Sequence, residues 1–229
     1  MQGRIVLSCR GFDPCPKTAI SPRLPKNKRQ GNIPLKSRPR LVVGISGASG
    51  VIYGIRLLEI LRKQPIETHL VMTKAAEMTI ALESDYKPAQ VRSLASVSYP
   101  VADVGAALSG GSFRTLGMIV APCSVRTMSE IATGATSNLL TRAADVVLKE
   151  RRRLVLLLRE TPLHSGHLRS MLALSDAGGI IMPPVPAFYT RPQSVEEIVD
   201  QTLGRALDLF DIDPGITRRW GEDIGFRKG

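Results

Sequence analysis

The chain has 229 residues, a length that fits one large domain with an extension better than two domains. Hydrophobic residues make up 43% and charged residues 22%, and no apolar run is long enough for a membrane span, so we expect no membrane-spanning segment. Of the formal net charge of +11, residues 1–40 contribute ten Lys and Arg against one acid, which leaves 21 bases and 19 acids for the rest. This nearly neutral remainder disfavours nucleic-acid binding.

The first residues differ from the rest in composition. Residues 1–40 hold six of the sixteen prolines and show no sustained apolar period, so we predict an unpacked extension over 1–38 and a single domain over 39–229. The extension is rich in arginine and poor in acids, which is typical of an organelle presequence, but it has only three serines. A solvated extension is the alternative. We expect a cytoplasmic protein if the chain is bacterial and a mitochondrial one if the extension is a presequence.

Strands and helices alternate from residue 40 onward. Strands are predicted over residues 40–46, 67–74, 116–124, 153–160 and 179–189. Helices are predicted over about 51–61, 75–83, 140–150, 163–178 and 195–210. Because the strands are apolar throughout, they predict an α/β fold with a parallel sheet covered on both faces, a Rossmann-like or flavodoxin-like three-layer sandwich. A ligand in such a fold binds at the carboxyl ends of the strands.

The stretch GISGASG, residues 44–50, follows the first predicted strand. Its glycines do not have the G-x-G-x-x-G spacing, and the second strand ends in Thr73 and Lys74 rather than in the acid that binds a ribose diol. A dinucleotide is therefore disfavoured. Backbone N–H groups together with the hydroxyls of Ser46 and Ser49 suit a monophosphate, and a tight turn with ordinary caps is the alternative.

Charged residues of the second half of the domain suggest an anion site. Arg142 and Lys149 share one helix face, and Asp145 is placed to pair with Lys149. Arg159 and Glu160 end an apolar strand, where cations can hold a phosphate and a carboxylate can transfer a proton. Arg205 lies on the apolar stripe of the last helix. Its side chain can extend to solvent or point inward at an anion, and the sequence favours neither direction.

Cysteine and histidine residues are few. They are Cys9, Cys15, Cys123, His69, His164 and His167. Their number and spacing predict no disulfide framework and no metal site, and they fit a reducing compartment. Cys123 is predicted to be a packed residue rather than a nucleophile, and His164 and His167 to be surface or capping residues.

Six stretches resemble the UbiX-type flavin prenyltransferase family, which includes proteins formerly called aromatic or phenylacrylic acid decarboxylases. They are GISGASGVIYGIRLLE, ETHLVMTKAA, GSFRTLGMIVAPCS, LLTRAADVVLKERR, LVLLLRETPLHSGHLRSML and MPPVPAFYTRPQS. The resemblance runs from about Pro39 to Trp220 and so covers the whole predicted domain.

The resemblance implies a flavodoxin-like subunit that joins dimethylallyl monophosphate to reduced FMN, with bonds at the flavin N5 and C6 and without a metal. The product, prenylated FMN, is the cofactor of UbiD-type decarboxylases. The resemblance also implies a homododecamer with sites at subunit boundaries, where some residues, Arg159 especially, serve a neighbour's site.

The resemblance also implies roles for individual residues. The FMN-binding set is Gly47, Ala48, Ser49, Thr73, Ser124, Val125, Arg126, Thr127, Arg142 and Arg159. The dimethylallyl phosphate set is Ser49, Glu83, Lys149, Arg159, Tyr189 and Arg205, with Trp220 as an aromatic lid. Glu160 is the expected proton shuttle to the leaving phosphate, with Lys149 and Arg159 as further catalytic residues. The site must stabilise a departing anion and a developing allylic cation.

Two alternatives belong to other classes. One is an FMN-dependent cysteine decarboxylase of related fold, which needs an essential histidine; the only histidine in a predicted strand is His69. The other is a flavin-carrying subunit of a decarboxylase complex with no chemistry of its own. Neither would form prenylated flavin.

Overall fold

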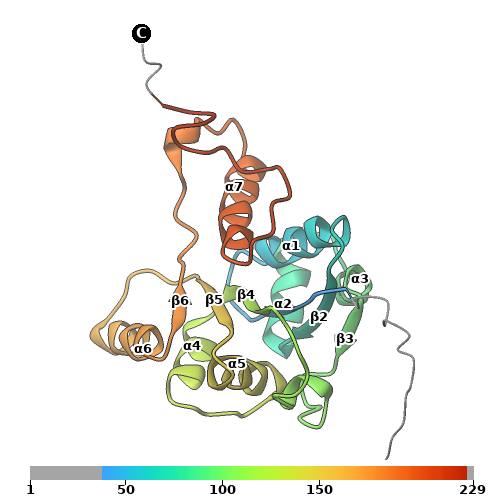
Figure 1. Cartoon of the computed structure of the whole chain (residues 1–229). Helices are drawn as coiled ribbons and strands as arrows, with labels where there is room; N and C mark the ends of the chain where they lie inside the picture. Colours follow the sequence, from blue (N-terminus) through green and yellow to red (C-terminus); the bar gives the residue numbers. More distant parts are fainter. Residues whose placement is uncertain (1–37, 226–229) are drawn as a thin grey trace, which may run out of the picture. The chain divides into compact units, whose positions relative to one another are not determined.

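A computed structural model describes residues 38–225 (Figure 1). The predicted extension lies outside the described residues except for Arg38. The strands are β1 (Arg40–Ile45), β2 (Glu67–Met72), β3 (Val97–Tyr99), β4 (Gly117–Cys123), β5 (Arg153–Leu158) and β6 (Gly179–Ile181). The helices are α1 (Ile52–Arg62), α2 (Lys74–Glu83), α3 (Pro88–Leu94), α4 (Val125–Ala132), α5 (Leu139–Lys149), α6 (Ser165–Asp176) and α7 (Val195–Asp208), with short 3₁₀ turns η1 (Ala107–Ser109) and η2 (Phe188–Thr190).

The six strands form one parallel sheet in the order β3-β2-β1-β4-β5-β6. This order reverses direction between β1 and β4, as it does in Rossmann-like sheets, and a ligand is expected where the loops after these two strands separate. The predicted α/β architecture is confirmed.

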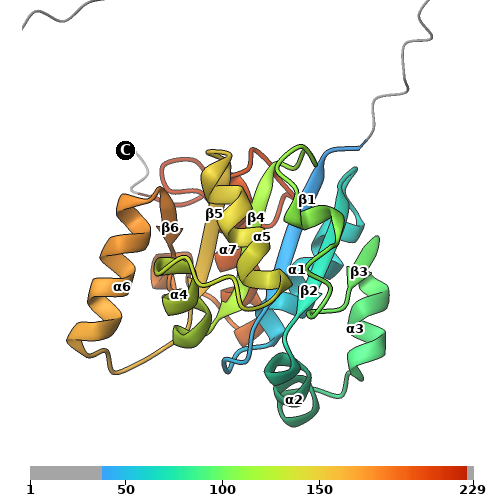
Figure 2. The ribbon, with the colours of Figure 1, turned by 90° about the horizontal axis from the view of Figure 1, so that it is seen from below.

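Both faces of the sheet are covered, which explains why the strands are apolar throughout. On β1, Leu41 and Val43 pack with α1, α3 and α7 on one face, while Val42 packs with α4, α5 and α6 on the other. All three side chains are at most 1% exposed. Figure 2 shows α5 in front of the sheet and α7 behind it.

The structure differs from the sequence prediction at several elements. β3, α3 and α4 were not predicted, and the last strand ends at Ile181 instead of residue 189. The proline-rich stretch that follows explains the second difference, because Pro183 and Pro184 have no N–H to donate to a ladder. His164 caps α6, since its Nδ1 accepts from the N–H of Gly166 at 3.0 Å, so the capping prediction is confirmed.

Within residues 38–225, no helix has the length and hydropathy of a membrane span. In the same range, no three His, Cys, Asp or Glu side chains are grouped as metal ligands would be.

Candidate active site

A cavity of about 640 Å³ opens at the carboxyl ends of β1, β2, β4 and β5, the position that the strand order predicts. Its volume lies in the range of small-molecule sites. Its lining is Gly47, Ala48, Ser49, Thr73, Lys74, Ala75, Val101, Ser124, Val125, Arg126, Thr127, Glu130, Ser137, Asn138, Arg159 and Glu160. Ten of these are site residues predicted from the sequence.

The turn after β1 forms one wall of the cavity. A methyl group on Gly47 would come within 2.3 Å of the Cβ of Ala75, so only glycine lets this turn close against the start of α2. Gly50 has a φ of +90°, which glycine adopts without strain, and α1 begins two residues later. The two glycines therefore meet different needs, a close approach to α2 at Gly47 and a positive φ at Gly50.

Glu83 occupies the amide donors of this turn. Its Oε2 accepts from the N–H of Gly50 at 2.8 Å and from the N–H of Val51 at 3.1 Å. Burial alone would raise the pKa of Glu83, but hydrogen bonds from the Ser49 hydroxyl and these two amides, with the charge of Arg159, hold its pKa below the usual range. The carboxylate, not a phosphate, is the anion that these two amides bind here.

Ser46 is fully buried, so the expectation that its hydroxyl faces a phosphate is wrong. Its Oγ donates to the carbonyl of Pro122 at 2.9 Å and accepts from the N–H of Ser124 at 2.8 Å. Both capacities of the hydroxyl are used inside the protein.

Two hydroxyls cap helices at the cavity wall. Thr73 Oγ1 accepts from the N–H of Ala76 at 3.1 Å and caps α2. Ser124 Oγ accepts from the N–H of Thr127 at 3.2 Å and caps α4, and it also donates to the Thr127 hydroxyl at 3.1 Å. The strand ends therefore turn into helices through capping serine and threonine residues, and these residues face the cavity.

Cys123 ends β4 and is buried, and burial raises the pKa of its thiol. A thiol that stays protonated is a poor nucleophile. The prediction of a packed, unreactive cysteine is therefore consistent with its surroundings.

Arg159 and Glu160 leave β5 together at the rim of the cavity. The Arg159 N–H donates to the carbonyl of Cys123 at 3.0 Å, and Glu160 Oε1 accepts from the N–H of Thr161 at 3.1 Å. Among residues 38–225, no carboxylate lies within ion-pair distance of the Arg159 guanidinium, which is exposed. The rim thus offers a cation and a carboxylate side by side to a ligand.

Six predicted site residues do not line this cavity: Glu83, which binds the turn after β1, and Arg142, Lys149, Tyr189, Arg205 and Trp220. Arg142 pairs with Asp145 at 2.7 Å and donates to the carbonyl of Ser109 at 3.2 Å. Lys149 pairs with Glu150, so the predicted Asp145–Lys149 pair is wrong. Their predicted roles remain predictions.

The other three of these residues lie on or beside the C-terminal part of the chain. Arg205 on α7 pairs with Asp208 at 2.5 Å and points to solvent rather than into the core. Tyr189 and Trp220 contact each other edge to face, with ring centroids 5.5 Å apart. Their side chains are 42% and 63% exposed, which is unusual for large aromatic residues.

Several residues of the cavity wall were not predicted as site residues: Lys74, Ala75, Val101, Glu130, Ser137 and Asn138. Lys74 was placed at a strand end but given no role. Val101 follows β3, a three-residue strand without an apolar pattern, and Ser137 and Asn138 belong to the loop before α5. An Asn three residues before Thr141 in LLTRAADV is a helix-start signal that would have placed Asn138 at a cap.

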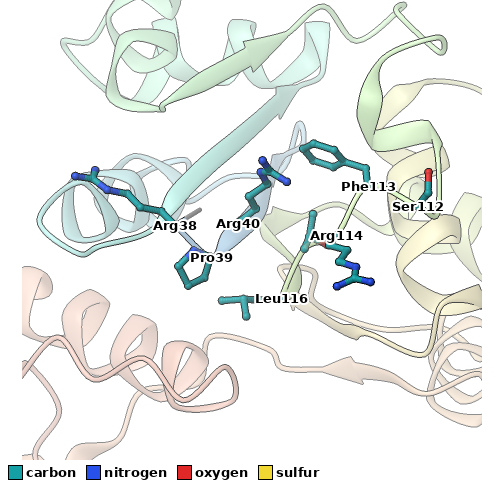
Figure 3. Close-up of a pocket in the computed structure, with 8 residues that line it drawn as sticks. Arg38, Pro39, Arg40, Ser112, Phe113, Arg114 and Leu116 are labelled. Atoms are coloured by element: carbon teal, nitrogen blue, oxygen red, sulfur yellow. The ribbon is translucent and has the colours of Figure 1, made fainter. Parts of the chain in front are cut away.

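A second hollow, of about 410 Å³, lies at the opposite, amino edge of the sheet (Figure 3). Arg38, Arg40 and Arg114 line it. Figure 3 shows Arg38 and Arg114 pointing away from each other, and the Arg40 guanidinium stacks 4.7 Å from the ring centroid of Phe113. Because these charges do not converge, the cavity at the carboxyl edge is the candidate active site.

Comparisons with known proteins show the family to which the chain belongs. The family model described as Flavoprotein matches residues 34–212. The chain is 58% identical to the flavin prenyltransferase UbiX of Escherichia coli K12 over 174 residues, which cover 76% of this chain and 92% of the relative. It is 51% identical to a mitochondrial flavin prenyltransferase of Saccharomyces cerevisiae over 181 residues, 79% of this chain and 75% of the relative.

Solved structures agree with these sequence matches. The chain is similar to a UbiX protein crystallised with FMN and dimethylallyl pyrophosphate, with a TM-score of 0.80 and 52% identity over 83% of this chain and all of that one. It is also similar to a dodecameric FMN-dependent UbiX-like decarboxylase of Escherichia coli O157:H7, with a TM-score of 0.78 and 50% identity over 79% of this chain and 98% of that one. A cysteine decarboxylase, at 16% identity and a TM-score of 0.51, shares the fold alone.

Proposed function

The chain belongs to the UbiX-type flavin prenyltransferases, and from this membership we propose where in the subunit its substrates react. It is a flavin prenyltransferase that makes prenylated FMN from FMN and dimethylallyl phosphate. We assign the reaction to the cavity at the carboxyl edge. One observation supports this assignment above the others: the turns after β1, β4 and β5, each predicted to touch FMN, line one cavity.

Phosphate release is the step that the rim residues are suited to assist. When the C–O bond of dimethylallyl phosphate breaks, the phosphate leaves with the electron pair and the allyl group becomes cationic. Arg159 at the rim offers an unpaired guanidinium to the phosphate, and Glu160 beside it exchanges a proton with a phosphate oxygen. Each new bond, at N5 and at C6 of the reduced flavin, uses an electron pair of the flavin and releases a proton from that atom. The allylic cation accounts for the first bond, and protonation of the remaining alkene makes the cation needed for the second.

Glu83 adds a fixed negative charge near this rim. Its carboxylate is bound by the amides of Gly50 and Val51, and its lowered pKa keeps it ionised at neutral pH. A carboxylate held in place before the reaction stabilises a cation without reorganising. We therefore assign Glu83 to the side of the site where the allylic cation forms, and not to the phosphate.

Lys149 is too far from this cavity to act there in the same subunit. It ends α5, its ammonium lies over Gly111, and β5 begins four residues later at Arg153. The six residues of β5 then span about 20 Å before Arg159 is reached. Lys149 thus lies at the amino edge of the sheet, as the pairing of Gly117 with Arg153 at the strand starts confirms.

We infer that Lys149, Arg142, Tyr189, Arg205 and Trp220 complete the site of a neighbouring copy in a homo-oligomer. The rings of Tyr189 and Trp220 are exposed, and the chain after β6 runs away from the sheet in Figure 1. Both observations fit a role at a subunit boundary. The dodecameric relative supports an assembly of this kind.

A mixing experiment tests the composite site. The Glu160→Gln protein and the Lys149→Ala protein are each expected to be nearly inactive. Mixed oligomers, formed when the two proteins exchange subunits, should regain activity. If each site draws these two residues from different copies, random mixing restores about a quarter of the sites. No recovery after demonstrated subunit exchange would place both residues in one subunit's site and overturn the proposal.

Product formation distinguishes this function from the two alternatives. The protein is incubated without oxygen with reduced FMN and dimethylallyl phosphate, and the flavin is analysed by mass spectrometry. Prenylated FMN is expected; unchanged FMN would favour a flavin carrier or a cysteine decarboxylase. The structure does not favour a cysteine decarboxylase, because His69 is buried between Tyr99 and Glu67, outside the cavity.

Two further assignments extend the proposed function. We propose that a UbiD-type decarboxylase receives the prenylated FMN, and its activation by the reaction mixture is the test. The compartment depends on residues 1–38: a mature N-terminus near residues 35 to 40 would identify a presequence, and an intact N-terminus would identify a retained extension.

A further inference from the structure

Ser46 links two strands at the point where they separate. Its hydroxyl donates to the carbonyl of Pro122 at 2.9 Å and accepts from the N–H of Ser124 at 2.8 Å, so it spans Cys123. The Ser46 N–H donates to the same Pro122 carbonyl at 3.2 Å. With a side chain that is fully buried, Ser46 does not itself line the cavity.

The two hydrogen bonds of the Ser46 hydroxyl replace ladder hydrogen bonds that the sheet loses where β1 and β4 separate. Pairing of β1 with β4 ends at Gly44 and Val120, and the register of β4 with β5 shifts between Val120 and Cys123. Backbone groups beyond that point are still buried and need partners. A hydroxyl can satisfy a carbonyl and an N–H at the same time, which an apolar or acceptor-only side chain cannot do.

The segment 122–124 is held from both sides. The Ser46 hydroxyl binds it from the end of β1, and the N–H of Arg159 binds the carbonyl of Cys123 at 3.0 Å from the end of β5. Ser124 then caps α4 and faces the cavity. The same few atoms therefore fix Ser124 and Arg159 relative to each other.

We propose that Ser46 is a positioning residue for prenyl transfer, acting through the segment 122–124. It keeps Ser124 and Arg159 at the spacing that bound FMN requires. This inference rests on the proposed roles of Ser124 and Arg159. A small displacement of a binding group lowers affinity and rate well beyond the value of the hydrogen bond itself.

Ser46→Ala is the test variant, and Thr68→Val is its matched control. The Thr68 hydroxyl is also buried and accepts a backbone N–H, that of Ser96 at 2.9 Å, but it lies at the amino end of β2. Both variants should lower the melting temperature by similar amounts. Only Ser46→Ala should raise the FMN dissociation constant, by about tenfold in a fluorescence titration.

Further variants separate this inference from the proposed function. Ser46→Thr keeps the hydroxyl and should bind FMN within about twofold of the parent. If Ser124→Ala leaves FMN binding unchanged, the proposed role of Ser124 fails. If Ser124→Ala weakens binding while folded Ser46→Ala or Ser46→Cys binds FMN as the parent does, the positioning role alone is overturned. The double variant with Ser46→Ala and Ser124→Ala should lose less FMN-binding free energy than the sum of the losses in the two single variants.

Discussion

The two edges of the sheet carry polar groups that are used in different ways. At the amino edge, two arginines are bound within the protein: Arg152 donates to the carbonyls of Phe113 and Gly111 at 2.8 and 2.6 Å, and Arg153 pairs with Asp211 at 3.2 Å. At the carboxyl edge, the Arg159 guanidinium faces a larger cavity and no carboxylate of residues 38–225 pairs with it. Positive charge alone therefore does not mark the site; groups that are held in place and left free for a ligand do.

The largest expected effect is at the carboxyl edge. Glu160→Gln removes the proton shuttle while keeping the shape of the rim, so prenyl transfer should fall by about 10²- to 10⁴-fold with FMN binding unchanged. Single-turnover formation of prenylated FMN measures the first quantity and fluorescence titration the second. Glu196→Gln, on the exposed first turn of α7, is the control. Equal turnover of Glu160→Gln and the parent would remove the assigned role.

A smaller but distinct effect is expected at the turn after β1. In Gly47→Ala the new methyl group meets the Cβ of Ala75 at 2.3 Å, so α2 must move and stability should fall by about 1–3 kcal/mol. FMN affinity should fall with it, because the turn and α2 are both cavity walls. Denaturant unfolding and FMN titration measure the two losses.

The control for this variant is Gly105→Ala, whose methyl group would lie 3.6 Å from the nearest atom, an ordinary contact. It should change stability by less than about 0.5 kcal/mol. Adding Ala75→Gly to Gly47→Ala restores part of the space and should recover part of the affinity. Unchanged FMN binding in Gly47→Ala would show that the close approach of the turn to α2 is not needed for the site.

The sequence predicts part of this site and not the rest. The edge of the sheet and the turns at residues 47–49, 124–127 and 159–160 follow from apolar strands that end in polar residues, because parallel strands bring their ends together. The sequence does not show that the Ser46 side chain turns inward, because its direction depends on where β1 and β4 separate. It also does not show that Glu83 binds the amides at the start of α1, because 33 residues separate Glu83 from Gly50.

The short elements and the distant cations were harder to predict for a different reason. β3 has three residues and none of them is fully buried, so it has no apolar pattern to detect. Arg142 and Lys149 share one face of the helix in the stretch LLTRAADVVLKERR. This spacing predicts a common role, but it does not predict which subunit's cavity the two side chains reach. A helix of one subunit can supply side chains to the site of a neighbouring copy in a symmetric oligomer.

At the amino edge, stability rather than binding should respond to pH. Burial lowers the pKa of His69 despite the nearby carboxylate of Glu67, with Arg40 also lowering it. The unfolded chain then binds more protons than the folded one below about pH 6.5, so stability falls as the pH falls, by at most about 1.4 kcal/mol per pH unit. His69→Gln should flatten this slope between pH 7.5 and 5.5 in urea unfolding and leave FMN affinity at pH 7.5 unchanged. An unaltered slope would assign the pH dependence to other groups.

The smallest effect is expected for the arginines of the amino-edge hollow. Arg38 and Arg114 are exposed, and they lie roughly one strand length, about 20 Å, from the cavity, more than twice the screening length of about 8 Å at physiological ionic strength. Changing both to alanine should alter stability by less than about 0.5 kcal/mol and leave the FMN dissociation constant unchanged. A weaker FMN complex in this double variant would mean that the amino edge contributes more than Lys149 to a neighbour's site, because charge at this distance has no other route to the ligand.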